Sequence, residues 1–307
     1  MSKEQLVVTV PTVELRDALQ GELPDDVRVE VWPMEGPSGQ DHIDLAVLPY
    51  MAPPELLSTL QGEKITTIQS QALGYDNAEK HLPEGITLSN AMGVHEGATA
   101  ELTVALVLAA QRDLDLYFAQ QREGGWEQQF SPGLQGKTVL LVGTGGVGQA
   151  IHDRLEPFEV EVVRSASRAR TDERGTVHGP EDLPRLVGEA DVVILGTPLT
   201  EQTRHMFDAE MIANMKAGAL LVNIGRGPLV DTDALVQAVS EGRIRAALDV
   251  MDPEPLPADH PLRSLPGVLF TPHVGGRSAS MQQRVVALLQ EQVGLMRQGK
   301  EAAHRVL

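Results

Sequence analysis

The stretch that decides the fold is Thr138-Val-Leu-Leu-Val-Gly143-Thr-Gly145-Gly-Val-Gly148, which runs into an amphipathic segment at 149–158. The short apolar run predicts a buried strand, and the amphipathic segment predicts a helix. A GxGxxG pattern alone also occurs in structural turns. Between a strand and a helix, however, it is the fingerprint of a dinucleotide-binding turn.

Each glycine of this turn has its own physical reason. Gly143 permits the tight turn, Gly145 lets the backbone approach a pyrophosphate, and Gly148 lets the helix lie close to the strand. The helix N-terminus adds N–H groups and the positive end of its dipole. We therefore expect the cofactor phosphates to be held by the residues of the turn, Gly143, Thr144, Gly145, Gly146, Val147 and Gly148.

Short apolar runs like the one before the turn recur along the chain. They lie at residues 6–10, 27–32, 43–48, 65–68 and 86–88, and then at 160–164, 192–195, 220–224, 245–248 and 269–270. Helical segments at 13–20, 54–61 and 77–81 separate the earlier runs. This alternation is typical of parallel strands that are buried on both faces. The sequence therefore predicts an α/β fold with two doubly wound parallel-sheet domains.

Two longer helices are also predicted. Residues 96–123 read as one continuous helix of about 40 Å at 1.5 Å per residue, and Gly124-Gly125 ends it. Its first half is apolar nearly all round, which indicates burial on most sides. A last helix is expected over residues 281–299.

Composition excludes several classes of protein. The 307 residues include no cysteine, so thiol nucleophiles, disulfides and thiolate metal sites are absent. A net charge of −18 would repel the nucleic-acid backbone and anionic membranes, so we expect neither as a partner. The apolar runs at 6–10 and 98–110 are too short for a signal peptide and for a membrane span of about 20 residues, which predicts a cytoplasmic protein.

Three later segments, taken with the glycine turn, closely resemble the D-isomer-specific 2-hydroxyacid dehydrogenases. They are Leu221-Val-Asn-Ile-Gly-Arg226-Gly-Pro-Leu-Val-Asp231, Leu248-Asp249-Val-Met-Asp-Pro-Glu254-Pro255 and Phe270-Thr-Pro-His273-Val-Gly-Gly276. The resemblance extends to Gln71-Ala-Leu-Gly-Tyr-Asp76, and so covers essentially the whole chain. It implies a Rossmann NAD(P)-binding domain at 95–279 and a flavodoxin-like substrate domain at 1–94 plus 280–307.

The resemblance implies a catalytic set of three residues. Arg226 would bind the substrate carboxylate and polarise the 2-keto oxygen, which suits a forked, permanently charged guanidinium. His273 would protonate the carbonyl oxygen as hydride arrives, since an imidazole exchanges protons near neutral pH. Glu254 would orient the imidazole and favour its charged form. Alone, each residue could equally be a surface charge or a solvated turn.

The segment after the second strand of this domain indicates the cofactor. NAD sites carry an acidic residue there, about 20 residues beyond the turn, but Ala166 occupies the place in this chain. Ser167 and Arg168 could hydrogen-bond a 2′-phosphate, which a carboxylate would repel. A solvated basic loop is the alternative. We expect NADP rather than NAD.

Further contacts follow from the resemblance alone. Cofactor contacts are implied for Thr197, Pro198, Ile224, Asp249 and Gly275. For the substrate, the backbone N–H groups of Leu73 and Gly74 would meet the carboxylate, and the pocket wall would include Leu48, Tyr50 and Met51. No metal site is expected, because His95-Glu96 lacks the second histidine of an HExxH motif.

The resulting hypothesis is an NADPH-dependent reductase of a small 2-keto acid, with glyoxylate or hydroxypyruvate favoured. The family likeness also implies a homodimer. Two alternatives remain open at this point: a dinucleotide-sensing binding protein of the corepressor kind, without turnover, and a dehydrogenase of formate or phosphite.

Overall fold

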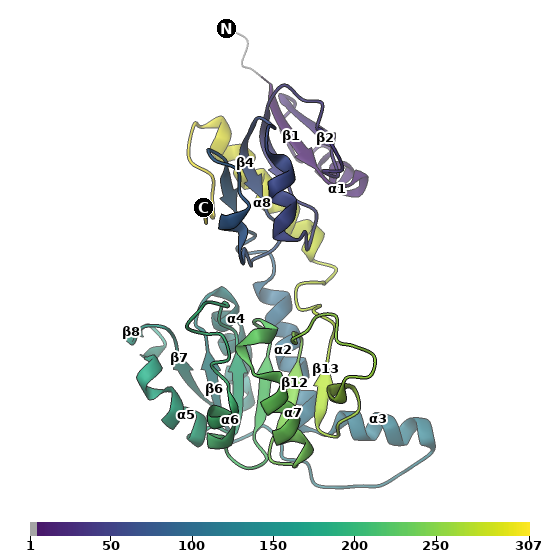
Figure 1. Ribbon diagram of the computed structural model, residues 1–307, viewed down its shortest axis with the longest axis vertical. Coiled ribbons are helices and arrows are strands. Elements are labelled where there is room, and N and C mark those ends of the chain that lie inside the picture. The colour runs from purple at the N-terminus through teal and green to yellow at the C-terminus, as the bar shows by residue number, and fades with distance from the viewer. Residues whose placement is uncertain (1–4) are drawn as a thin grey trace. The chain divides into compact units, whose positions relative to one another are not determined.

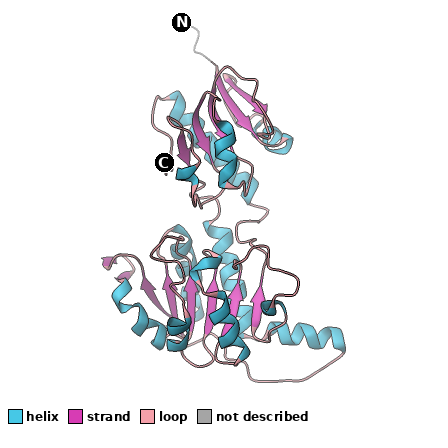
Figure 2. Cartoon of the chain, viewed as in Figure 1, coloured by secondary structure: helices cyan, strands magenta, loops and turns pink. Residues whose placement is uncertain are grey.

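The computed structural model describes residues 5–307, which form two compact α/β units (Figure 1). The first unit comprises the chain as far as His95 together with Arg277–Leu307, and the second comprises Glu96–Gly276. Each has its own sheet, parallel in the first unit and parallel but for one edge strand in the second, with helices on both faces, so the expected α/β fold class is confirmed (Figure 2).

The sheet of the first unit has five parallel strands in the order β2-β1-β3-β4-β5. This is the flavodoxin-like order. The strands are β1 (Leu6–Val10), β2 (Val27–Val31), β3 (Ile43–Val47), β4 (Ile65–Gln69) and β5 (Thr87–Ser89). Helices α1 (Val13–Leu19) and α8 (Met281–Arg297) pack on one face. Short 3₁₀ helices at Pro54–Leu60 and Ala78–Lys80 lie where full crossover helices were expected, and the first of them covers the other face.

The sheet of the second unit has eight strands in the order β13-β12-β11-β10-β6-β7-β9-β8. Their bounds are β6 (Thr138–Val142), β7 (Glu161–Ser165), β8 (Arg170–Asp172), β9 (Gly175–His178), β10 (Val192–Leu195), β11 (Leu220–Asn223), β12 (Arg245–Leu248) and β13 (Val268–Phe270). The hairpin of β8 and β9 was not predicted, because its strands are short and polar. Only β8 runs antiparallel to its neighbour.

Helices cover both faces of this second sheet. Helices α2 (Glu96–Gln111) and α4 (Gly146–Leu155) bury their apolar side chains against one face. Helices α5 (Leu183–Glu189), α6 (Ala209–Asn214) and α7 (Thr232–Ser240) do so on the other. The chain proceeds from β6 to β7 and β9, then returns to β10 beside β6. Ligands of such sheets bind at this reversal, beyond the carboxyl ends of the strands.

The prediction of one continuous helix over 96–123 was wrong. Asp113 adopts a left-handed backbone conformation (φ 51°) that separates α2 from α3 (Leu114–Glu123). The carbonyl groups at the end of α2 are bound elsewhere: that of Ala110 accepts from Arg245, and that of Gln111 accepts from Gly133 N–H. Asp tolerates the left-handed region better than most residues, so a single Asp ends the helix at a point where the sequence has neither Gly nor Pro.

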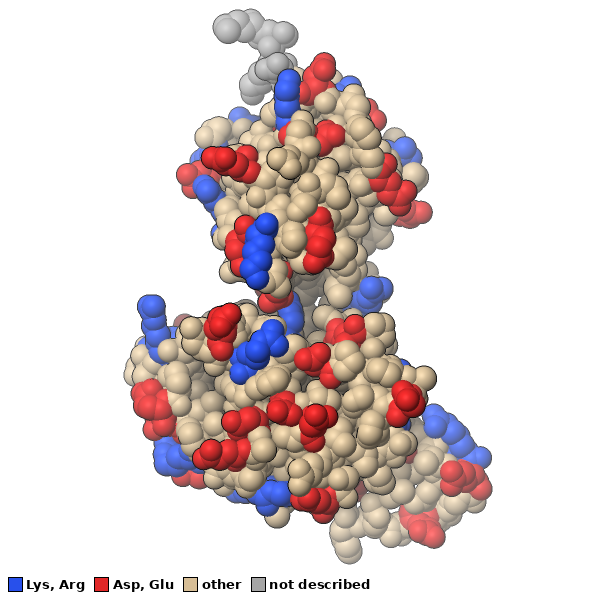
Figure 3. All heavy atoms as spheres, viewed as in Figure 1, with Lys and Arg blue, Asp and Glu red and all other residues tan. Residues whose placement is uncertain are grey.

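Acidic and basic side chains are interspersed on the face of each unit seen in Figure 3, and the basic ones form no continuous patch there. No helix among the described residues is long and apolar enough to cross a membrane.

Candidate active site

The glycine turn lies where the strand order reverses. Gly143 follows β6 with φ +107°, and a Cβ on it would lie 2.6 Å from the carbonyl oxygen of Gly196 after β10. The N–H group of Gly196 in turn donates to the Val142 carbonyl, with an N···O distance of 2.8 Å. Backbones of two loops therefore approach too closely for any side chain at Gly143. This close approach places the turn at the reversal between β6 and β10.

The other glycines of the turn differ in what surrounds them. A Cβ on Gly148 would overlap the carbonyl oxygen of Gly143. Gly145 has nothing within 4 Å of such an atom and lies at φ −74°, which any residue can adopt. It precedes α4, whose first turn receives no side-chain cap from it. The N–H groups at this helix start are thus available to an anion.

This contrast predicts different effects for two alanine variants. Gly148→Ala should destabilise the protein by about 1–3 kcal/mol, because the added methyl group has no room. Gly145→Ala should leave the melting temperature unchanged but weaken NADPH binding about tenfold or more, because its methyl group would occupy the approach of the pyrophosphate. Thermal unfolding and fluorescence titration with NADPH measure the two effects. Equal cofactor affinity in Gly145→Ala and wild type would contradict the assignment of the turn.

The three arginines after β7 are in different environments. Arg164 is buried and forms two hydrogen bonds with Asp172, at 2.8 and 3.0 Å. These bonds hold the pKa of the Asp172 carboxyl below its ordinary value. Arg170 donates to the hydroxyl of Thr144 in the glycine turn at 2.7 Å. Arg168 is exposed and makes no hydrogen bond or ion pair with the described residues. Of the three, it is the one whose guanidinium is uncommitted.

His273 and Glu254 form a hydrogen-bonded pair beyond β13 and β12. The Nδ1 atom of His273 lies 2.9 Å from Oε2 of Glu254, while Oε1 accepts from Met251 N–H at 2.8 Å. A carboxylate only accepts, so Nδ1 carries the proton and Nε2 is left for another partner. Both side chains are about one-third exposed, His273 by 31% and Glu254 by 33%, so a small molecule can reach them.

The environment favours the ionised form of Glu254. Burial alone would raise the pKa of this carboxyl, but the hydrogen bonds from His273 and Met251 lower it. The charges of His273 and Arg226 lower it further, and the resulting pKa is below its ordinary value. The structure thus brings Arg226, Glu254 and His273 into one electrostatic environment.

A buried aspartate holds the loop that carries His273. The side chain of Asp249 is 2% exposed, and its two oxygens accept from the Val274 and Gly275 N–H groups at 2.9 and 2.8 Å. The first oxygen also accepts from the Thr271 hydroxyl. The His273 N–H donates to the carbonyl of Asp249, and His273 itself lies at φ 52°. Asp249 was expected only as a cofactor contact; holding this uncommon backbone conformation was not foreseen.

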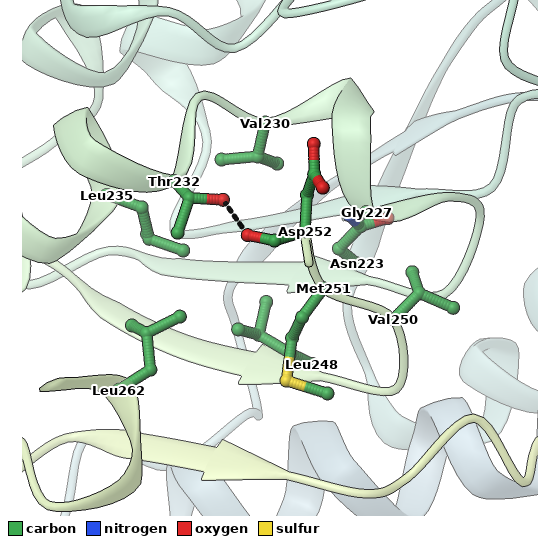
Figure 4. Close-up of a pocket in the computed structure, with 10 residues that line it drawn as sticks. All are labelled: Asn223, Gly227, Val230, Thr232, Leu235, Leu248, Val250, Met251, Asp252 and Leu262. Atoms are coloured by element: carbon green, nitrogen blue, oxygen red, sulfur yellow. Dashed lines mark hydrogen bonds between the residues drawn. The ribbon is translucent and has the colours of Figure 1, made fainter. Parts of the chain in front are cut away.

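Arg226 lies in a loop held at both ends. Its carbonyl accepts from the side chain of Asn223 at 2.9 Å, and the same side chain accepts from Gly225 N–H. A Cβ on Gly227 would overlap the Met251 carbonyl, so this loop lies against the segment that leads to Glu254. Figure 4 shows the small pocket where the two segments meet, with Thr232 bonded to the Asp252 carbonyl at 2.8 Å.

The remaining cofactor candidates lie at the same edge of the sheet. Thr197 and Pro198 follow β10, and Ile224 follows β11. A Cβ on Gly275 would lie 2.9 Å from the Asp249 carboxylate and close to Thr99 of α2. Parallel strands direct all their carboxyl ends to one edge, which explains why residues so distant in sequence are neighbours.

The substrate candidates of the first unit also follow its strands. Leu48, Tyr50 and Met51 come after β3, and Met51 is exposed. Leu73 and Gly74 come after β4, in a loop that begins at the buried residue Gln71. Gln71 donates to the Leu48 carbonyl at 2.7 Å, so the two segments are tied together. Among the described residues, no group of His, Asp and Glu side chains could hold a metal ion.

Comparisons with known proteins agree with this geometry. Residues 104–275 match the model of the "D-isomer specific 2-hydroxyacid dehydrogenase, NAD binding domain". A glyoxylate reductase of Thermofilum pendens is 36% identical over 73% of this chain and 69% of its own. A hydroxypyruvate reductase of Thermotoga maritima is also 36% identical, over 76% and 78%.

A solved structure supports the same assignment. The NADPH-dependent glyoxylate/hydroxypyruvate reductase of Sinorhizobium meliloti, in complex with NADP and malonate, superposes with a TM-score of 0.80 at 25% identity. The match covers 98% of this chain and 97% of that one. The chain belongs to the D-isomer-specific 2-hydroxyacid dehydrogenase family and is an oxidoreductase that uses a nicotinamide dinucleotide.

Proposed function

We propose that the protein reduces a small 2-keto acid to the D-2-hydroxy acid with NADPH, and that glyoxylate or hydroxypyruvate is the substrate. The observation that carries this proposal is the Glu254–His273 pair, with Nε2 of the imidazole free of the carboxylate and the charge of Arg226 close by. Relatives named as reductases of these two acids support the substrate. They do not favour a binding protein without turnover.

The residues divide the reaction between them. Arg226 binds the substrate carboxylate and draws electron density toward the 2-keto oxygen. The N–H groups of Leu73 and Gly74 are further carboxylate contacts in this proposal. The nicotinamide, when bound, supplies the hydride to C2. In its imidazolium form His273 carries a second proton on Nε2 and gives it to the carbonyl oxygen. The ring keeps its Nδ1 proton on Glu254, whose negative charge then stabilises the next protonation of Nε2. Leu48, Tyr50 and Met51 form the pocket wall.

The direct test is the loss of NADPH absorbance with purified protein and a panel of 2-keto acids, formate and phosphite being tried with NADP. Turnover of glyoxylate or hydroxypyruvate is the expected result. Tight NADPH binding without turnover of any acid would contradict the proposal and favour a sensor. Turnover of formate or phosphite alone would contradict it as well.

For the cofactor we propose a preference for NADP, with the 2′-phosphate held by Arg168 and Ser167. Both are exposed beside the glycine turn, and no carboxylate engages Arg168 among the described residues. Arg170, in the same segment, donates a hydrogen bond to the Thr144 hydroxyl and so ties this segment to the glycine turn. Contacts of Thr197, Pro198, Ile224, Asp249 and Gly275 with the rest of the cofactor belong to this proposal.

The variant Arg168→Asp tests this preference. It replaces a forked cation by a charge that repels the 2′-phosphate, so the ratio of kcat/KM for NADPH to that for NADH should fall about 100-fold. Arg164→Lys is not a suitable control, because Arg164 is buried and its guanidinium is hydrogen-bonded to Asp172. Arg16→Asp, which changes an exposed arginine of α1 in the other unit, is the matched control. An unchanged ratio in Arg168→Asp would show that the phosphate is held elsewhere.

We also propose that the protein is a homodimer. Helix α3 buries none of its residues within the chain, and the segment after it leaves Trp126 91% and Phe130 106% exposed. Large aromatic side chains in water are typical of a surface covered by a partner. A molar mass in solution equal to that of one chain would contradict this.

A further inference from the structure

The loop that carries Leu73 and Gly74 shows an asymmetry between its carbonyl and N–H groups. Two of its carbonyls are bound: that of Ala72 accepts from Ala91 N–H at 3.0 Å, and that of Leu73 accepts from the Asn90 side chain at 2.9 Å. In contrast, the N–H groups of Leu73 and Gly74 donate to nothing among the described residues. Successive free N–H groups on a loop whose carbonyls are tied back form a site for an anion.

A buried histidine binds the first carbonyl of this loop. Nε2 of His95 lies 2.5 Å from the carbonyl oxygen of Gln71, and the His95 residue is 4% exposed. A carbonyl can only accept, so Nε2 carries the proton. Nδ1 is then an acceptor, and it has no hydrogen-bond partner in the structure. The single hydrogen bond to Gln71 is therefore the polar contact that orients this ring.

His95 also contacts the proposed pocket wall. The ring of Tyr50 lies 5.6 Å from the His95 ring, centroid to centroid, with the planes tilted by 30°. The side chain of Gln71 reaches the Leu48 carbonyl on the same side. One imidazole thus contacts both the start of the loop and the segment after β3.

We propose that His95 is a positioning residue for the substrate. Its Nε2–H holds the Gln71 carbonyl so that the N–H groups of Leu73 and Gly74 stay free for the carboxylate of the 2-keto acid. This inference rests on the proposed function for the identity of the anion. His95 itself takes no part in proton transfer, because its Nε2 proton is committed to a buried carbonyl.

The variants His95→Leu and His95→Gln test the proposal. Leucine cannot donate a hydrogen bond, so in His95→Leu the Gln71 carbonyl loses the bond from His95 that holds the start of the loop. KM for glyoxylate should therefore rise about tenfold or more. The kcat value should change by less than about threefold, and the affinity for NADPH should stay the same. Glutamine offers an amide N–H in place of Nε2, so His95→Gln should recover most of the affinity.

The matched control is His152→Leu. His152 lies on α4 in the other unit, is 9% exposed, and also has an Nδ1 atom without a partner. The variant His152→Leu should lower the stability of the protein as His95→Leu does, but it should not raise KM for glyoxylate. A similar rise of KM in both variants would overturn the proposal, as would a fall of kcat at unchanged KM in His95→Leu.

Hydrogen–deuterium exchange separates this inference from the proposed function. Amides at 72–76 should exchange faster in His95→Leu than in wild type and in His152→Leu, whether or not any acid is turned over. Glyoxylate added with NADPH should slow exchange at these amides in wild type. Unchanged exchange in His95→Leu would overturn the anchoring role even if the enzyme is active. Inactivity of wild type together with faster exchange in His95→Leu would refute the proposed function alone.

Discussion

Replacement of Arg226 by alanine is expected to lower kcat/KM for glyoxylate about 10³-fold. The guanidinium is the group proposed to bind the carboxylate and to polarise the carbonyl, and loss of one partner of such a charged pair costs about 2–5 kcal/mol. NADPH affinity should remain nearly intact, because the glycine turn and the loop after β7 are untouched. Stopped-flow reduction and NADPH titration of the same preparation measure both effects.

The structure also makes the Arg226 test interpretable. Its loop is held by backbone groups and by Asn223, which accepts from Gly225 N–H and donates to the Arg226 carbonyl, and these bonds survive truncation of the side chain. Arg226→Lys keeps the charge but not the fork, and should recover only part of the rate. Joint loss of NADPH binding and activity in Arg226→Ala would instead indicate a folding defect and contradict the assigned role.

The second large effect concerns His273. Since reduction consumes the proton held by the imidazole, the reductive rate should fall as pH rises. In His273→Asn, kcat should drop about 10²–10⁴-fold and lose this dependence. The measurement is the pH profile of kcat for both proteins between about pH 4 and about pH 9. A flat profile for wild type would contradict the role of His273.

Glu254 determines the acidic side of the same profile. Its pKa is below the ordinary value, chiefly because hydrogen bonds from His273 and Met251 outweigh the effect of burial. A depressed folded-state pKa stabilises the protein above the unfolded pKa, and this contribution is lost only as pH falls through the folded value. The ionised carboxylate of Glu254 is also the form that holds the imidazole of His273. The rate should therefore not decline on the acidic side until the pH falls below the usual range of a glutamate pKa. Glu254→Gln should lower kcat, because the amide no longer supplies the negative charge that stabilises a protonated imidazole.

Much of the fold could be predicted because the signals were local. Short apolar runs located eleven of the thirteen strands near their observed ends, since a strand buried on both faces must be apolar throughout. The β8–β9 hairpin lacks such a run and was missed. The break at Asp113 was missed for another reason: it depends on Arg245 and Gly133, which are distant in sequence, binding the last carbonyls of α2.

The same division applies to the site. The motifs singled out Arg226, Glu254 and His273 before any geometry was known. They could not show that Asp249 holds the His273 loop, since its partners are backbone N–H groups that carry no sequence signal. Nor could they show the uncommitted state of Arg168, or the burial of His95 on a carbonyl of the Leu73 loop.

By itself the sequence determined the α/β class, the glycine turn and the residues able to do the chemistry, because strand periodicity and side-chain chemistry are properties of short segments. Tertiary structure decided which arginine is free, which aspartate supports the proton donor and which histidine anchors a loop. Those outcomes depend on hydrogen bonds between segments far apart in the chain, such as Arg164 with Asp172 and His95 with Gln71. A buried polar group must have a hydrogen-bond partner, and only the packed chain determines which group lies close enough to be that partner.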